Sequence, residues 1–141
     1  MATVNIYLTF NGDCEKAFKF YQSVFGTEIT FMGHFRDTPP EQHGMKLNPG
    51  EEDKIMHATL KISKETMIMG CDAVGDWATK FSTGTNFCIS IGTANKEESE
   101  KIFNGLSAEG KVWVALNKTF WSEYFGVLTD KFGITWMLNQ N

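Results

Sequence analysis

Hydrophobic residues recur at two spacings in the first half of the chain. Residues 4–10 carry an apolar side chain at every second position, which is typical of a half-buried strand. Residues 14–25 follow the helical period, with Asp13 placed to cap the start and Gly26 to end the helix. Three further strands are predicted at 27–35, 55–62 and 66–72. This order predicts a βαβββ module.

The same order of elements returns in the second half. A strand is expected at 85–91, and Asn95 followed by Glu98 forms a capping-box signature for a helix that ends near Gly110. The three remaining strands are predicted at 111–118, 122–130 and 133–139. At an offset of 81 residues the strand at 4–10 aligns with the strand at 85–91, so one βαβββ unit occurs twice.

We therefore expect a single domain over residues 1–141, built from a first module (1–72), a linker (73–84) and a second module (85–141). Residues 36–54 show no periodicity and exceed the usual length of a connection. We expect this long loop to be either a lid over a ligand or an arm exchanged between the subunits of a homodimer.

Composition excludes several classes of partner. The net charge is -4 and the thirteen lysines and arginines are scattered, which argues against nucleic acid. The sequence contains no apolar run long enough to cross a membrane, and its start lacks the features of a signal peptide, so we expect a cytoplasmic protein without a membrane partner. Three widely spaced cysteines suit reduced thiols rather than disulfides or a zinc cluster.

The duplication and two motifs carry a resemblance to a known family. With NGDCEKAFKFYQSVFG at 11–26 and DKFGITWMLN at 130–139, the chain resembles the PhnB-like branch of the vicinal oxygen chelate superfamily, which includes glyoxalases, bleomycin-resistance proteins and dioxygenases. The resemblance implies an α+β fold in which tandem βαβββ modules form an open, curved mixed sheet. It also implies that the helix of each module covers the outer face and that ligands bind in the concave cleft.

The resemblance further implies where metal-using members hold a divalent ion. They use four side chains, usually His, Gln or Glu, from the first and last strand of each half. Carried over to this chain, those positions hold two neutral amides and two thioethers: Asn5, Met69, Asn86 and Met137. Such a set offers no anionic ligand, so we predict no metal and no other cofactor. A divalent metal held by misregistered ligands is the alternative.

Strand parity selects the residues expected to line the cleft. If the alternating apolar side chains pack under the helix, their neighbours face the ligand. The predicted ligand-binding residues are Asn5, Tyr7, His57, Met67, Met69, Asn86 and Met137. His57 is also a candidate general base, and so is Glu123, which lies between aromatic residues. The alternatives are a hydrogen-bonded structural histidine and an exposed surface glutamate.

Three hypotheses of function remain from the sequence. The first is a metal-free protein that binds a small, aromatic or anionic molecule in the cleft, and the second is a metal-dependent lyase, isomerase or dioxygenase that uses His57 and Glu123. The third is a resistance protein that sequesters a drug or toxin between two subunits. Relatives are sometimes labelled methyltransferases, but the chain has no strand followed by a glycine-rich turn and a helix that would cradle a nucleoside cofactor.

Overall fold

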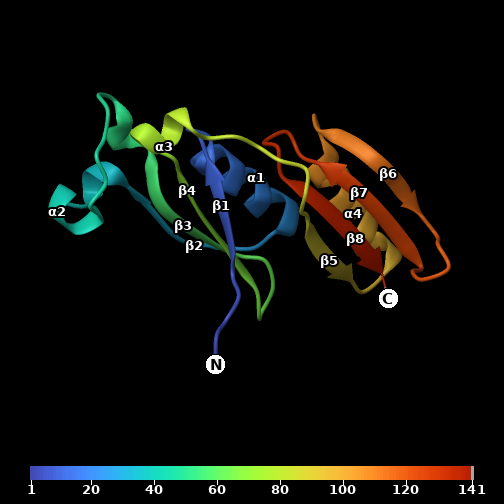
Figure 1. The fold of residues 1–141 in the computed structure, drawn as a ribbon. Coiled ribbons are helices and arrows are strands. Elements are labelled where there is room, and N and C mark those ends of the chain that lie inside the picture. The colour runs from blue at the N-terminus through green and yellow to red at the C-terminus, as the bar shows by residue number, and fades with distance from the viewer. Residues whose placement is uncertain (141) are drawn as a thin grey trace. The chain divides into compact units, whose positions relative to one another are not determined.

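The structure, a computed structural model, describes residues 1–140, so Asn141 at the end of the predicted second module lies outside the described part. Contacts divide the chain into two compact units, Met1–Phe81 and a second unit that begins at Ser82. Each unit holds one four-stranded mixed sheet with one long helix (Figure 1). The predicted α+β fold with tandem βαβββ modules is therefore confirmed.

The sheet of the first unit has the strand order β1-β4-β3-β2, with β1 parallel to β4 and the other pairs antiparallel. Its elements are β1 (Ile6–Phe10), α1 (Cys14–Phe25), β2 (Ile29–His34), β3 (Ile55–Lys61) and β4 (Met67–Asp72). Alternate residues of the strands are buried together with one stripe of α1, as the two periodicities predict. This core includes Leu8, Phe10, Ala17, Phe18, Tyr21, Ala58, Leu60 and Ile68.

The loop expected at 36–54 is more ordered than its sequence predicts. It contains two single-turn 3-10 helices and one short α-helix: η1 (Phe35–Asp37), α2 (Pro40–His43) and η2 (Glu51–Asp53). The buried Glu51 carboxylate fixes it by accepting hydrogen bonds from the backbone N–H groups of Asn48 and Gly75, at 2.6 and 2.9 Å. The loop thus packs on its own unit, because a buried carboxylate needs these donors.

The stretch expected to be a linker also contributes to the first unit. Ala73 and Val74 are buried, and α3 (Asp76–Thr79) follows them. Only the residues after Phe81 belong to the second unit.

The second unit repeats this architecture with the strand order β5-β8-β7-β6. Its elements are β5 (Ile89–Thr93), α4 (Lys96–Ser107), β6 (Lys111–Asn117), β7 (Tyr124–Thr129) and β8 (Thr135–Gln140). The predicted cap is present, since the Asn95 side chain accepts a hydrogen bond from the Glu98 backbone at 2.8 Å. Trp136 and Leu138 of β8 are fully buried in its core.

The predicted offset between the halves is wrong by two residues. The first strands of the units begin at Ile6 and Ile89, which are 83 residues apart, so the strand expected at 85–91 lies two residues later. The alternation of Phe87, Ile89 and Ile91 hid this shift, because a displacement of two keeps every side chain on the same face. Phe87 is 63% exposed and precedes the strand.

Candidate functional site

The sheet of the first unit has one face that α1 does not cover. Strand register sets Tyr7 of β1 beside Met69 of β4, Met69 beside Thr59 of β3, and Thr59 beside Phe31 of β2. These residues alternate with the buried ones that pack on α1, so their side chains share the opposite face. We call this surface the open face of the first unit, and it comprises Tyr7, Phe31, His57, Thr59, Lys61, Met67 and Met69.

His57 lies at the centre of this open face, where both of its ring nitrogens have partners. The Tyr7 hydroxyl lies 3.1 Å from Nδ1, and the Thr59 hydroxyl lies 3.3 Å from Nε2. Two aromatic rings flank the imidazole, with centroids 5.7 Å away for Tyr7 and 6.0 Å away for Phe31. Gly33 gives the Phe31 ring its place, because a Cβ at Gly33 would lie 3.0 Å from that ring.

The Tyr7 phenol keeps its proton in the folded protein. Although 47% of Tyr7 is exposed, its hydroxyl end lies against His57 and Cys71. Burial of that end raises the pKa of the phenol well above its ordinary value, and the hydrogen bond with the Cys71 thiol raises it further. The phenol has one hydrogen, which it can donate to His57 Nδ1 or to the Cys71 sulfur, and the direction of the bond between Nε2 and the Thr59 hydroxyl depends on the tautomer of His57. In the tautomer with its hydrogen on Nε2, the imidazole donates to Thr59 and leaves the Thr59 hydroxyl hydrogen for an incoming acceptor.

The raised pKa of Tyr7 predicts that its phenol does not ionise when the folded protein is titrated to alkaline pH. A free tyrosine is half ionised at about pH 10. At this pH, folded wild-type protein and folded Tyr7→Phe should show the same phenolate absorbance. After unfolding in urea at this pH, the wild type should gain about half a phenolate more than the variant. Because the folded state holds this proton more tightly than the unfolded state, the contribution of Tyr7 to stability is complete below about pH 10 and falls as the pH rises further. An extra phenolate in the folded wild type at that pH would contradict the burial of the hydroxyl.

The structure brings together four of the seven residues predicted to bind ligand: Tyr7, His57, Met67 and Met69 all lie on the open face of the first unit. Asn5 is exposed and directly precedes β1. Met137 pairs with Ser90 in the sheet of the second unit, and Asn86 precedes that sheet. With the corrected offset, the counterpart of Asn5 in the second unit is Cys88 rather than Asn86.

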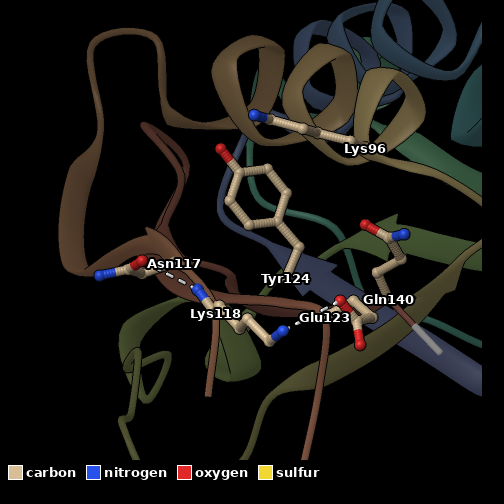
Figure 2. A pocket seen from close by; sticks show the side chains of 6 residues that line it. All are labelled: Lys96, Asn117, Lys118, Glu123, Tyr124 and Gln140. Carbon is tan, nitrogen blue, oxygen red and sulfur yellow. Dashed lines mark hydrogen bonds and ion pairs between the residues drawn. The ribbon is translucent and has the colours of Figure 1, made fainter.

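Glu123 occupies a different surface. It lines a polar pocket of about 310 Å³ at the start of β7, together with Lys96, Asn117, Lys118, Tyr124 and Gln140 (Figure 2). Its carboxylate lies 3.7 Å from the Lys118 ammonium, and both side chains are largely exposed. A general base with a raised pKa needs a desolvated site. The sequence allows two interpretations of Glu123, a general base and an exposed surface glutamate. Its position in the structure favours the second.

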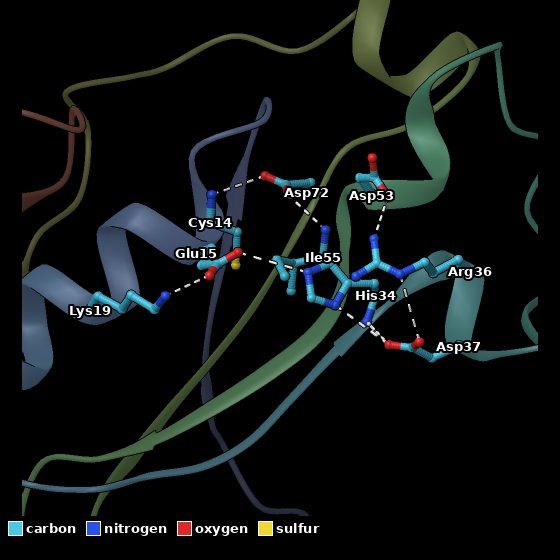
Figure 3. A network of polar contacts seen from close by, with 9 residues as sticks. All are labelled: Cys14, Glu15, Lys19, His34, Arg36, Asp37, Asp53, Ile55 and Asp72. Atoms are coloured by element: carbon cyan, nitrogen blue, oxygen red, sulfur yellow. Dashed lines mark hydrogen bonds and ion pairs between the residues drawn. The ribbon is translucent and has the colours of Figure 1, made fainter.

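The polar network near the start of α1 was not predicted from the sequence. The buried Asp72 carboxylate accepts a backbone hydrogen bond from Gly12. It also accepts backbone hydrogen bonds from Cys14 and Ile55 (Figure 3). On the neighbouring surface, His34 lies 3.7 Å from Glu15 and 3.4 Å from Asp37. Asp72 has a structural role, because both of its oxygens are taken by the backbone. No sequence pattern marks this network, because the donors are backbone N–H groups of segments that are distant in the chain.

The residues at the implied metal positions do not fit a divalent ion. Around these positions Tyr7 pairs with Met69 in the first unit, and Ser90 pairs with Met137 in the second. The Asn5 amide, the Cys88 thiol and the two thioethers give no carboxylate to bind such an ion, and the imidazole of His57 beside Tyr7 has both ring nitrogens in hydrogen-bond contact with hydroxyl groups. Within residues 1–140, no three His, Cys, Asp or Glu side chains lie close enough together to share a metal.

The fold of the chain is found in known proteins. Its two four-stranded mixed sheets, each with a covering helix, match solved structures of glyoxalase/bleomycin resistance/dioxygenase proteins that share less than 25% of its sequence. Over the described residues, no helix has the length and apolar character needed to cross a bilayer. The chain belongs to the PhnB-like family, because the family model described as 3-demethylubiquinone-9 3-methyltransferase matches residues 2–139.

Three similar proteins support this assignment. Protein YjdN of Escherichia coli K12 is 31% identical over 138 residues, which cover 94% of this chain and 91% of YjdN. The crystal structure of PA1353 from Pseudomonas aeruginosa has 32% identity and a TM-score of 0.84, covering 100% of this chain and 98% of the other. A PhnB protein from Bacillus cereus, named a putative 3-demethylubiquinone-9 3-methyltransferase, has 25% identity and a TM-score of 0.78, covering 99% and 100%.

Proposed function

We propose that this protein binds a small organic molecule on the open face of the first unit, without a metal ion. The observation that carries the proposal is the His57 centre, in which an imidazole is oriented by Tyr7 and Thr59 and flanked by aromatic rings. The lining of a ligand site typically combines apolar side chains with a few oriented polar groups. The centre combines both features on a face that α1 leaves open.

The side chains around His57 favour an aromatic ligand that carries an acidic group. Phe31 is 51% exposed and Met67 is 45% exposed, so apolar surface is available for a ring. The Thr59 hydroxyl offers a hydrogen to an acceptor. Lys61 lies beside Met67 on the same face and is exposed, so its ammonium can attract an anion. These groups suit a planar ring with a carboxylate.

The family description names a methyltransferase. The turns that precede the two long helices of this chain offer no binding site for the cofactor of such an enzyme. The turn between β1 and α1 holds one glycine, Gly12, whose N–H is already bonded to Asp72 at 2.9 Å. The turn between β5 and α4 holds no glycine. Nucleotide cofactors are usually held by free N–H groups in such turns. We therefore favour binding on the open face over methyl transfer.

Thr59→Val tests the proposed site with little change in shape. In a thermal-shift and saturation-transfer NMR screen of aromatic carboxylates, ligands found with the wild type should bind the variant about tenfold more weakly, because one hydrogen bond to a charged group is lost. Thr66→Val, in the exposed turn between β3 and β4, is the matched control and should bind like the wild type. Equal affinity in both variants would place the ligand elsewhere.

The homodimer and the cytoplasmic location expected from the sequence stay predictions. The two interpretations of the loop at 36–54, a lid over a ligand and an arm exchanged between subunits, also stay predictions. Stoichiometric binding without turnover would favour the sequestering hypothesis over an enzyme.

A further inference from the structure

Two pockets adjoin at the turn between β6 and β7 in the second unit. The first is the polar pocket of about 310 Å³ described above, and it lies beside α4, since Tyr124 in its lining is hydrogen-bonded to Glu100 of that helix. The second, which we call the aromatic pocket, has a volume of about 290 Å³ and is lined by Lys118, Thr119, Phe120, Trp121, Ser122, Glu123 and Gln140. Because the two pockets share Lys118, Glu123 and Gln140, one molecule can occupy both.

The ion pair between Lys118 and Glu123 lies where the two pockets meet (Figure 2). The Lys118 ammonium and the Glu123 carboxylate are 3.7 Å apart, and the two side chains are 72% and 64% exposed. A charge-assisted hydrogen bond would bring such groups to about 2.7–2.9 Å. The pair is therefore loose, and both of its charged groups can bind a ligand.

Hydrogen bonds fix the turn that carries this ion pair. The buried Ser122 hydroxyl donates to the Gln140 carbonyl at 2.8 Å. Thr119 and Ser122 are joined twice, by the Thr119 N–H to the Ser122 carbonyl at 3.0 Å and by the Ser122 N–H to the Thr119 hydroxyl at 3.1 Å. Because the turn is already held in one conformation, little conformational entropy is lost when a ligand binds to it.

Two exposed aromatic rings form a wall of the aromatic pocket. Phe120 is 96% exposed and Trp121 is 55% exposed. The Trp121 ring packs edge-to-face against Phe120 and Phe125, with ring centroids 4.8 and 5.4 Å away. Neighbouring exposed aromatic residues form an apolar patch of the kind that marks binding surfaces. The free surface of the indole is therefore available to stack with the ring of a ligand.

The charges at the junction select the kind of ligand. A molecule with a single charge would pair with Lys118 or Glu123 and leave the other without a partner. A zwitterion provides partners for both, because its carboxylate binds the ammonium of Lys118 and its own ammonium binds the carboxylate of Glu123. An α-amino acid carries these two groups on one carbon, and its side chain extends from the same carbon.

We propose that the two pockets together bind a free aromatic α-amino acid, with its ring against Trp121 and its two charged groups at Lys118 and Glu123. The ammonium of Lys96 gives the polar pocket a second positive charge, which favours the ligand carboxylate on that side. The inference goes beyond the proposed function, because all of these residues belong to the second unit and the ligand is a zwitterion.

Titration with L-phenylalanine at pH 7.5 tests the proposal in two-dimensional nitrogen–proton NMR spectra of the full chain. Single substitutions assign the indole signals of the four tryptophans. The Trp121 signal should shift saturably at millimolar ligand, while that of Trp77, an exposed tryptophan in α3, should stay in place. His57→Ala should bind phenylalanine like the wild type, so failure of this site and failure of the proposed function are distinguishable. Equal, non-saturable shifts of Trp77 and Trp121 would overturn the proposal.

Charge-neutral variants of the ion pair test the recognition of the zwitterion. Lys118→Met and Glu123→Gln should each weaken phenylalanine binding about three- to fivefold, because each removes one exposed charge pair with the ligand. Lys101→Met and Glu97→Gln are the matched controls on the exposed surface of α4 and should leave the affinity unchanged. Wild-type affinity in both ion-pair variants would overturn the proposal.

Two analogues separate the contributions of the ligand charges. N-acetyl-L-phenylalanine lacks the ammonium, and L-phenylalanine amide lacks the carboxylate. Both should shift the Trp121 signal with an affinity at least about threefold lower than that of phenylalanine. Equal affinities for all three compounds would contradict recognition of a zwitterion. A Trp121 signal that shifts with protein concentration alone would also overturn the proposal, by showing that a second copy of the chain covers the aromatic pocket.

Discussion

Asp72→Ala is expected to lower the free energy of unfolding by about 3 to 5 kcal/mol. Asp72 is 1% exposed, and its Oδ1 accepts the backbone N–H groups of Gly12 at 2.9 Å and Cys14 at 3.0 Å. Its Oδ2 accepts that of Ile55 at 2.9 Å. The carboxylate therefore joins the end of β4 to the start of α1 and the start of β3. Alanine leaves three N–H groups without this acceptor, and each unsatisfied buried donor costs about 1 to 3 kcal/mol.

Urea unfolding followed by circular dichroism measures this effect. Asp76→Ala is the matched control, because Asp76 lies four residues away on the exposed start of α3 and should change stability by less than about 0.5 kcal/mol. Asp72→Asn should fall between the two, since one amide oxygen can still accept from part of the set. A loss below about 1 kcal/mol for Asp72→Ala would show that water replaces the carboxylate, and would contradict its burial.

Asp130→Ala is expected to destabilise the second unit by about 2 to 4 kcal/mol. Asp130 is 3% exposed, and its Oδ1 accepts the backbone N–H groups of Phe132 and Ile134 at 2.8 and 3.1 Å. Its Oδ2 accepts the indole N–H of Trp136 at 2.8 Å. Trp136 is fully buried, so the same carboxylate shapes the turn between β7 and β8 and satisfies the largest core side chain of the unit.

Tryptophan fluorescence measures the effect of Asp130→Ala directly. The variant should show a lower unfolding midpoint and a red-shifted emission at denaturant concentrations where the wild type is still folded. Glu123→Ala is the control in the same unit, since its exposed ion pair with Lys118 contributes little. If both variants unfold at the midpoint of the wild type, the Asp130 network does not hold the hairpin.

The order and faces of the secondary structure were predictable because they depend on local patterns. The helix predicted at 14–25 after Asp13 begins at Cys14 and ends at Phe25, with Gly26 at a positive φ of 65° as its cap. Tyr7 and His57 were assigned to the same face by strand parity alone. The error of two residues in the internal repeat left this parity intact. It did change the residue of the second unit that corresponds to Asn5, which is Cys88 and not Asn86.

The contacts that define the candidate site were beyond the sequence because they join distant segments. Tyr7 and His57 lie fifty residues apart, and they meet only because β4 lies between β1 and β3 in the sheet. No local pattern specifies this strand order. The buried carboxylates Glu51 and Asp72 were missed for the same reason, since their donors are backbone N–H groups that any residue but proline provides.

The central claim, metal-free binding at the His57 centre, is tested most directly by calorimetric titration of one aromatic carboxylate from the screen. The titration compares wild type and His57→Ala, each before and after dialysis against a chelator, with elemental analysis of the same samples. We expect the wild type to bind equally well in both states, with no stoichiometric metal, and His57→Ala to bind at least about tenfold more weakly. One equivalent of nickel, zinc, iron or manganese per chain, whose removal abolishes binding, would contradict the claim.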